Sequence, residues 1–203
     1  SRLEAEVSRK GPAGFAEGGM PADFQPSHRC GLAVDLGTTT IAVYLCDLVG
    51  QSVVGSVSVR NPQALFGDDV MSRISAVTGH PDRLSRLQQM VVRSIDWAAD
   101  ALAGSFRVDI SSLETLVVVG NPTMIHLLAG KDPSSIGVYP YLPTLDRWRW
   151  RAGDLGLRFN PTAAVRTLPL ISGFLGADIV AAAMASDLSA LPDGTMLVDV
   201  GTN

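Results

Sequence analysis

The sequence is poor in cysteine, in charge and in long apolar runs, and each shortage excludes a class of protein. Its only cysteines are Cys30 and Cys46, which are too few for a disulfide scaffold or for an iron–sulfur cluster held by this chain alone. No apolar run reaches the roughly 18 residues of a membrane-spanning helix. The formal net charge of −4 disfavours nucleic acid or an anionic membrane as the main partner. We therefore expect a cytoplasmic protein.

The first residues differ in composition from the rest of the chain. Glycine and proline recur throughout residues 1–29 and break any periodicity, which predicts a linker or an extended arm. His28 and Cys30 lie two positions apart, but without a second pair they do not make a metal site. Because the chain begins in a linker and ends in a strand and a turn, we expect it to be a fragment of a longer protein.

The stretch G-L-A-V-D-L-G-T-T-T, residues 31–40, is the most informative of the sequence. Alternating apolar residues predict a buried strand that ends at Asp35, and Gly37 permits a tight turn. Thr38, Thr39 and Thr40 then supply hydroxyl and backbone N–H groups, which suit a phosphate chain, while the aspartate suits a hydrated divalent metal. Strand character resumes after the turn, so a β-hairpin is predicted. The alternative is an ordinary hairpin with a polar tip.

The same pattern, an apolar run followed by Asp, any residue, Gly and Thr, recurs at the end of the chain in T-M-L-V-D-V-G-T-N, residues 195–203. Two strand–Asp–x–Gly–Thr signals predict two related subdomains that face one nucleotide. The pair resembles the phosphate motifs of the superfamily of acetate and sugar kinases, heat-shock chaperones and actin. We expect a linker over residues 1–29, a first subdomain over residues 30–194, and the first strand and phosphate motif of a second subdomain over residues 195–203.

Between these motifs the predicted elements follow one order. Strands are expected over residues 32–36, 41–47, 53–59, 116–119 and 167–171. Helices are expected over residues 82–103, ended by Gly104, and over residues 124–129. A third is expected to follow a turn at Gly173 and Gly176, to have Asp178 in its first turn and to run to about residue 187. This is the order of an α/β, ribonuclease-H-like half-domain: a five-stranded mixed sheet flanked by helices, with the start of a similar half at the C-terminus.

The turn after the fourth expected strand allows two interpretations. Gly120, Asn121, Pro122 and Thr123 separate a strand from a helix, where doubly wound sheets place ligands. Asn121 either caps the helix or also faces the terminal phosphate of a nucleotide. His126, on that helix, is expected to be a packed, hydrogen-bonded residue rather than a catalyst.

Two other stretches also remain open. Asp68 or Asp69 is predicted to cap a short helix and to form a surface ion pair with Arg73. The basic, aromatic run W-R-W-R, which begins at Trp148, either docks a partner or forms an edge strand that packs its tryptophans on one side.

An ordered series of motifs resembles the ATP-dependent reductive activators of corrinoid proteins. The resemblance covers residues 31–203 and is carried by V-D-L-G-T-T-T, R-N-P-Q, G-D-D-V-M-S-R-I, G-N-P-T-M, G-F-L-G-A-D and V-D-V-G-T-N. It implies ATP and Mg as cofactors and a corrinoid protein as partner. Members of that family use ATP to drive a one-electron reduction of an inactive Co(II) corrinoid to Co(I), which restores methyl transfer.

The resemblance also implies roles for single residues. Asp35, Asn121 and Asp199 would be catalytic, with Asp35 and Asp199 holding Mg through water. Phosphate would be bound by Gly37, Thr38, Thr39, Thr40, Gly120, Thr123, Gly201, Thr202 and Asn203. The candidates for a partner interface are Asn61, Gln63, Asp69, Arg73, Trp148 and Trp150.

Two departures from the family limit what this chain is expected to do. The cysteines for a two-iron two-sulfur cluster are absent, so that cluster would belong to an N-terminal domain outside this sequence. The adenosine-binding half is absent as well, so we expect this chain to be inactive by itself.

Two rival classes and one feature of assembly stay open. A small-molecule kinase or phosphohydrolase of the same superfamily would consume ATP with a small acceptor, and an actin-like assembly protein would use nucleotide to control polymerisation. A homodimer through the exposed sheet edge is a further expectation.

Overall fold

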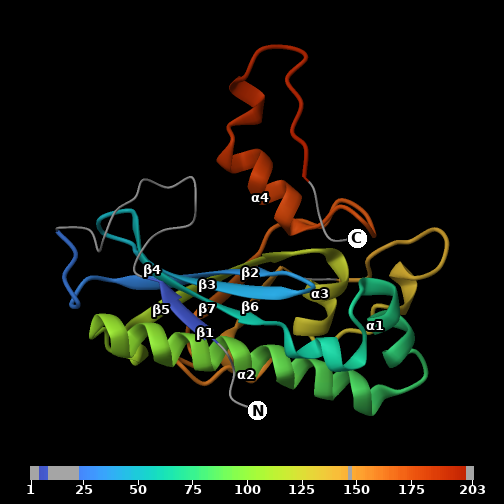
Figure 1. Ribbon diagram of the computed structural model, residues 1–203, viewed down its shortest axis with the longest axis horizontal. Coiled ribbons are helices and arrows are strands. Elements are labelled where there is room, and N and C mark those ends of the chain that lie inside the picture. Colours follow the sequence, from blue (N-terminus) through green and yellow to red (C-terminus); the bar gives the residue numbers. More distant parts are fainter. Residues whose placement is uncertain (1–4, 9–22, 146–147, 200–203) are drawn as a thin grey trace.

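A computed structural model describes residues 5–8, 23–145 and 148–199 of the chain (Figure 1). The elements in chain order are β1 (Ala5–Ser8), β2 (Cys30–Leu36), β3 (Thr40–Asp47), β4 (Ser52–Arg60), η1 (Pro62–Phe66), α1 (Val70–Val77), α2 (Pro81–Phe106), η2 (Ile110–Ser112), β5 (Leu113–Gly120), α3 (Pro122–Leu128), η3 (Ser134–Ile136), β6 (Arg149–Arg151), η4 (Ala152–Leu155), β7 (Ala164–Thr167), α4 (Ala177–Ala185) and η5 (Leu188–Ala190). Among these residues, no helix combines the length and the apolar character that a bilayer crossing needs.

The strands form one mixed sheet in the order β1-β4-β3-β2-β5-β7-β6. Strands β2, β3 and β4 make the predicted antiparallel meander, and β2, β5 and β7 run parallel at the centre. This mixed α/β sheet confirms the predicted fold class. The expected count of five strands was too low, because β1 extends one edge along β4 and β6 extends the other along β7. The edge-strand interpretation of the W-R-W-R run is therefore correct.

Helix α2 lies along one face of the sheet, and α4 rises from the opposite face (Figure 1). The apolar stripe of α2 is buried against β3 and β4, with Leu87, Ile95 and Leu102 among its fully buried members. The prediction that Gly104 ends this helix is wrong. Helix α2 continues to Phe106 and ends where Arg107 adopts a left-handed conformation, φ 58°. Burying Phe106 favours the extra turn, and one glycine in a helix opposes it by only about 1 kcal/mol.

The C-terminal third departs most from the sequence prediction. Strand β7 is formed by Ala164–Thr167 rather than by residues 167–171, since Pro169 lacks the N–H group that a ladder needs. Helix α4, by contrast, begins at Ala177, after the two glycines of G-F-L-G-A-D and with Asp178 in its first turn, as predicted. Residues 195–199 form no strand with any described residue, so the strand predicted there is wrong over that range. Residues 200–203 lie outside the described residues.

Candidate phosphate-binding site

The hairpin between β2 and β3 has the shape that its sequence predicts. Leu32, Val34 and Leu36 point into the core, whereas Asp35 points to the opposite face and is open to solvent. The turn needs glycine at its start, because a Cβ on Gly37 would lie 2.6 Å from the carbonyl oxygen of Thr40. A side chain there would force the two strands apart.

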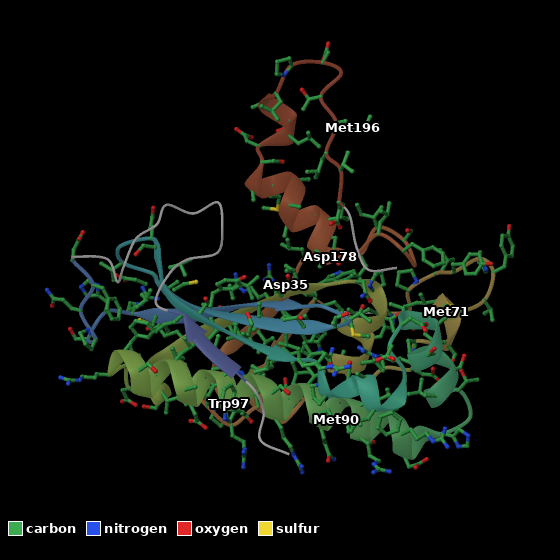
Figure 2. All side chains as sticks on the ribbon, viewed as in Figure 1. Asp35, Met71, Met90, Trp97, Asp178 and Met196 are labelled. Atoms are coloured by element: carbon green, nitrogen blue, oxygen red, sulfur yellow. The ribbon has the colours of Figure 1, made fainter. Side chains whose placement is uncertain are left out.

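A cleft of about 810 Å³ opens above this hairpin, within the size range of small-molecule sites. It brings together seven of the predicted site residues: Asp35, Gly37, Thr38, Thr39, Thr40, Asn121 and Asp199. The remaining lining residues are Asp69, Val70, Met71, Pro122, Gly173, Phe174 and Asp178. Figure 2 shows Asp35 on the sheet and Asp178 at the start of α4, facing the same space.

Four carboxylates line the cleft, and three of them, those of Asp35, Asp178 and Asp199, influence one another's charge. Loss of hydration among the surrounding protein atoms raises the pKa of Asp35, and the charges of Asp178 and Asp199 raise it further. Loss of hydration also raises the pKa of Asp178, with a smaller contribution from Asp199. Because Asp35 keeps solvent access, the cleft is a wet acidic site rather than a buried one.

The acidic group suits magnesium held through water. The described residues contain no set of three His, Cys, Asp or Glu side chains placed to bind a metal directly. Mg²⁺ commonly keeps several of its waters and prefers oxygen ligands, so carboxylates at a distance can still hold it. A divalent cation would also relieve the mutual repulsion that raises the pKa of Asp35 and Asp178.

Asn121 satisfies both of its sequence interpretations, because it caps α3 and also lines the cleft. Its side-chain oxygen accepts a hydrogen bond from the Met124 N–H at 3.0 Å, and its amide nitrogen donates to Thr38 Oγ1 at 3.0 Å. Since Thr38 Oγ1 accepts this bond, its own hydroxyl hydrogen stays available to donate toward the cleft. Asn121 is therefore positioned to orient Thr38, and its catalytic role stays a prediction.

Two predicted phosphate ligands do not line the cleft. Gly120 is buried at the end of β5, where a Cβ would lie 2.7 Å from the carbonyl oxygen of Leu36, so glycine there permits close strand packing. Thr123 is fully buried on α3, and its hydroxyl has no hydrogen-bond partner. Neither residue is exposed to a ligand in the cleft. Gly201, Thr202 and Asn203 lie outside the described residues.

Most of the predicted partner-interface residues are also placed elsewhere. Asn61, Gln63 and Arg73 are fully buried, and Trp150 is 8% exposed with its ring in the core. These four residues cannot form a docking surface, because their side chains are buried and pack or form hydrogen bonds inside the protein. Trp148 is half-buried against the same core.

Asp69 caps α1, as predicted, and lines the cleft as well. Its two carboxylate oxygens accept from the N–H and the hydroxyl of Ser72, at 2.8 and 2.6 Å, and these bonds lower the pKa of Asp69. The predicted surface ion pair between Asp69 and Arg73 is wrong, since Arg73 is buried and donates to neutral acceptors instead.

Sequence reasoning missed Asp178 as a cleft residue. The motif G-F-L-G-A-D carried a usable signal, because a second strand-to-helix turn with an acid is what brings a carboxylate to a sheet edge. Gly176 permits that approach, since a Cβ there would lie 2.5 Å from the carbonyl oxygen of Gly120 and 2.6 Å from Asn121 Cα. Val70, Met71 and Phe174 were missed as well; they lie in two of the family motifs, but apolar residues there do not by themselves indicate a cleft.

The histidines next to these elements have structural roles, as predicted for His126. Its Nε2 accepts from the Thr144 N–H at 3.0 Å, so its Nδ1–H donates to the Pro122 carbonyl at 2.7 Å. Burial lowers the pKa of His126 and keeps the ring neutral. His28 Nδ1 lies 2.8 Å from Asp47 Oδ2, which accounts for its side chain without a metal.

The sheet, its flanking helices and the cleft at the strand ends define an actin-like, ribonuclease-H-like half-domain. A family model described as "RACo middle region" matches residues 30–190, and the chain belongs to that family. The chain is 30% identical over 198 residues to "Corrinoid activation enzyme RamQ" of Eubacterium limosum, an alignment that covers 93% of this chain and 32% of the relative.

A solved structure agrees with this assignment. "Reductive activator for corrinoid,iron-sulfur protein" superposes with a TM-score of 0.78 at 34% identity, covering 86% of this chain and 27% of that one. The chain thus spans about a third or less of the length of the relatives it matches.

Proposed function

We propose that this chain is part of an ATP-dependent reductive activator, which reduces a corrinoid protein from Co(II) to Co(I). Its role in that protein is to bind the phosphates of ATP. The observation that carries the proposal is the cleft, which a threonine-rich hairpin lines together with the carboxylates of Asp35, Asp178 and Asp199. Membership of the RACo middle region family supports the same assignment, since the relatives' names state corrinoid activation.

In this proposal, each group at the cleft has a defined task. Thr38, Thr39 and Thr40 donate hydroxyl and backbone hydrogens to phosphate oxygens, as glycine- and threonine-rich turns do for anions. Asp35 and Asp199 hold the waters of Mg²⁺, which would neutralise the phosphates. The threonines would therefore contact the phosphate chain, and the carboxylates would hold the hydrated cation.

ATP would act on the reduction by linkage. Nucleotide binding would favour one arrangement of the activator. If that arrangement binds the Co(I) state of the corrinoid protein more tightly than the Co(II) state, ATP shifts the equilibrium between Co(II) and Co(I) toward Co(I) by the difference in affinity. In this proposal the electron would come from a two-iron two-sulfur cluster outside these residues, as the resemblance to the family implies.

The test uses the full-length protein, a Co(II) corrinoid protein and a chemical reductant, with the appearance of Co(I) followed by absorbance. We expect Co(I) to accumulate only with Mg·ATP, and Asp35→Asn to abolish the ATP effect. The matched control is Asp100→Asn, the same charge change on an exposed site of α2 far from the cleft. Equal Co(I) with and without ATP in the wild type would overturn the proposal.

The two rival functions make different demands on the same protein. A small-molecule kinase or phosphohydrolase would consume ATP when given a sugar, an acid or a polyphosphate in the absence of any corrinoid protein. An actin-like assembly protein would scatter light on addition of ATP. Neither rival has support from the relatives' names, and each is excluded by one inexpensive assay.

A further inference from the structure

The tip of the phosphate hairpin is held from beneath by one segment, residues 61–73, which we call the anchoring segment. Three successive carbonyl oxygens of the tip accept hydrogen bonds from it. Gly37 O accepts from Asn61 Nδ2 at 2.9 Å, Thr38 O from Arg73 Nη2 at 2.6 Å, and Thr39 O from the Asn61 backbone N–H at 2.8 Å. With its carbonyls tied inward, the turn is fixed in one conformation.

The anchoring segment is itself fixed to the core. Gln63 Nε2 donates to the Leu87 carbonyl on α2 at 2.9 Å, and Gln63 Oε1 accepts from Arg73 Nη1 at 3.3 Å. Asp69 caps the short helix that carries Arg73. The hairpin tip is therefore continuous, through buried hydrogen bonds, with α1 and α2.

Arg73 is an unusual choice for such an anchor, because its guanidinium is fully buried. Its other donors reach Gly67 O at 2.9 Å and Met124 Sδ at 3.2 Å, so every acceptor that it contacts is neutral. No carboxylate of the described residues lies within ion-pair distance of it, and Asp68 and Asp69 favour its charged form only through space. Burying a charge without a paired opposite charge is expensive.

The several N–H donors of the guanidinium explain why arginine suits this position, but they do not explain why a positive charge is buried beneath the hairpin tip. Arginine keeps its proton in proteins even when burial lowers its pKa, as it does here. One peptide unit, that of Thr38, separates the guanidinium from the cleft. The protein between the guanidinium and the cleft is poorly hydrated, so it screens the charge toward an anion less than water would.

We propose that Arg73 is a positioning residue of the phosphate site, which fixes the hairpin tip through Thr38 O and supplies the buried positive charge that favours a polyphosphate in the cleft. The proposal rests on the function proposed above, since the ligand it concerns is the phosphate chain of ATP. It gives the motif G-D-D-V-M-S-R-I a task inside the protein, where the sequence suggested a surface.

The experiment measures the affinity of the full-length protein for Mg·ATP and for AMP by calorimetry, for the wild type, Arg73→Met, Arg73→Lys and Arg93→Met. Arg93 is exposed on α2 and serves as the matched control for loss of one positive charge. We expect Arg73→Met to weaken Mg·ATP by about tenfold or more and AMP by less than about threefold, because charge acts in proportion to the phosphates. In Arg73→Lys, the ratio of the affinity for Mg·ATP to the affinity for AMP should return most of the way to the wild-type value. In Arg93→Met, that ratio should equal the wild-type value.

The outcomes separate the positioning role from a purely structural one. A structural role would lower the melting temperature and the bound stoichiometry but would weaken both nucleotides by the same factor, and that result would overturn the proposal. So would an Arg73→Lys variant with a ratio as low as that of Arg73→Met.

Two further outcomes are also decisive. If Arg73→Met does not fold, Asn61→Ser replaces it: removing the bond to Gly37 O should weaken Mg·ATP more than AMP, and an unchanged ratio would count against the anchoring. A wild-type protein that binds AMP but not Mg·ATP would overturn the proposed function and this proposal together, whereas tight binding with no effect of Arg73 would overturn only this one.

Discussion

Asn121 offers a substitution pair that separates folding from ligand binding. Asn121→Ala removes the α3 cap and the bond to Thr38 Oγ1. A lost N-cap costs about 1 kcal/mol and a lost hydrogen bond about 1 kcal/mol more, so the free energy of unfolding should fall by about 2 kcal/mol. For a domain of 203 residues that unfolds as one unit, that corresponds to a drop of about 4–8 °C in melting temperature.

Asn121→Asp should behave differently, because aspartate is an equally good N-cap. Its stability should stay within about 1 kcal/mol of the wild type. Its carboxylate, however, cannot donate to Thr38 Oγ1, and would instead accept the hydroxyl hydrogen that we expect to face the ligand. Mg·ATP affinity should therefore fall by about tenfold, or ~1.4 kcal/mol.

The assays are urea unfolding for stability and calorimetric titration with Mg·ATP for binding, each on the full-length protein. An aspartate variant as unstable as the alanine variant would refute the capping argument. An aspartate variant that binds Mg·ATP as tightly as the wild type would refute the claim that Thr38 donates to the ligand.

Three further substitutions or conditions test the packing. Gly104→Ala should raise the free energy of unfolding by about 0.8 kcal/mol, because the site is an exposed position inside α2 with open space around it; a decrease would contradict the observed helix. Gly176→Ala should lower it by about 2 kcal/mol or more, since the added Cβ would meet the backbone of Gly120 and Asn121, and both changes are measured by urea unfolding. His126 has its pKa lowered in the folded state, so the unfolded chain binds more protons. Stability should be full above the ordinary histidine pKa of about 6.5 and should fall as the pH drops through it, a dependence that His126→Gln should lose in unfolding curves taken between about pH 5 and 8.

The sequence was sufficient for those parts of the fold in which local pattern and tertiary packing agree. Alternating apolar residues around Asp35 predicted the central hairpin, and the heptad-like stripe of α2 predicted its buried face. The predicted ends of helices and strands were wrong where a contact distant in the sequence determines where the element ends. Burial of Phe106 carried α2 past Gly104, and pairing with β5 placed β7 three residues before the predicted start.

The site divides in a similar way. Residues whose position is set by their own turn, such as Gly37, Thr38 and Asn121, line the cleft, and their predicted roles stay predictions. Arg73 was assigned to a surface, because a charged residue without a sequence partner is usually solvated. Its burial depends partly on the Thr38 carbonyl, which lies 35 positions away in the chain and which no local pattern records.

The anchoring segment shows why the difference between a surface residue and a buried one matters for assigning function. A motif can be specific to a family because it contacts a partner or because it supports a site, and the residue types alone do not separate the two. Burial separated them here, since a fully buried Asn61 or Gln63 has no surface to offer.

Hydrogen exchange of the full-length protein, with and without Mg·ATP, tests the central claim most directly. The account predicts slower exchange at the backbone amides of Thr38 to Thr40 and at the start of α3, which border the cleft. Protection confined to other segments, with the hairpin amides unchanged, would contradict it.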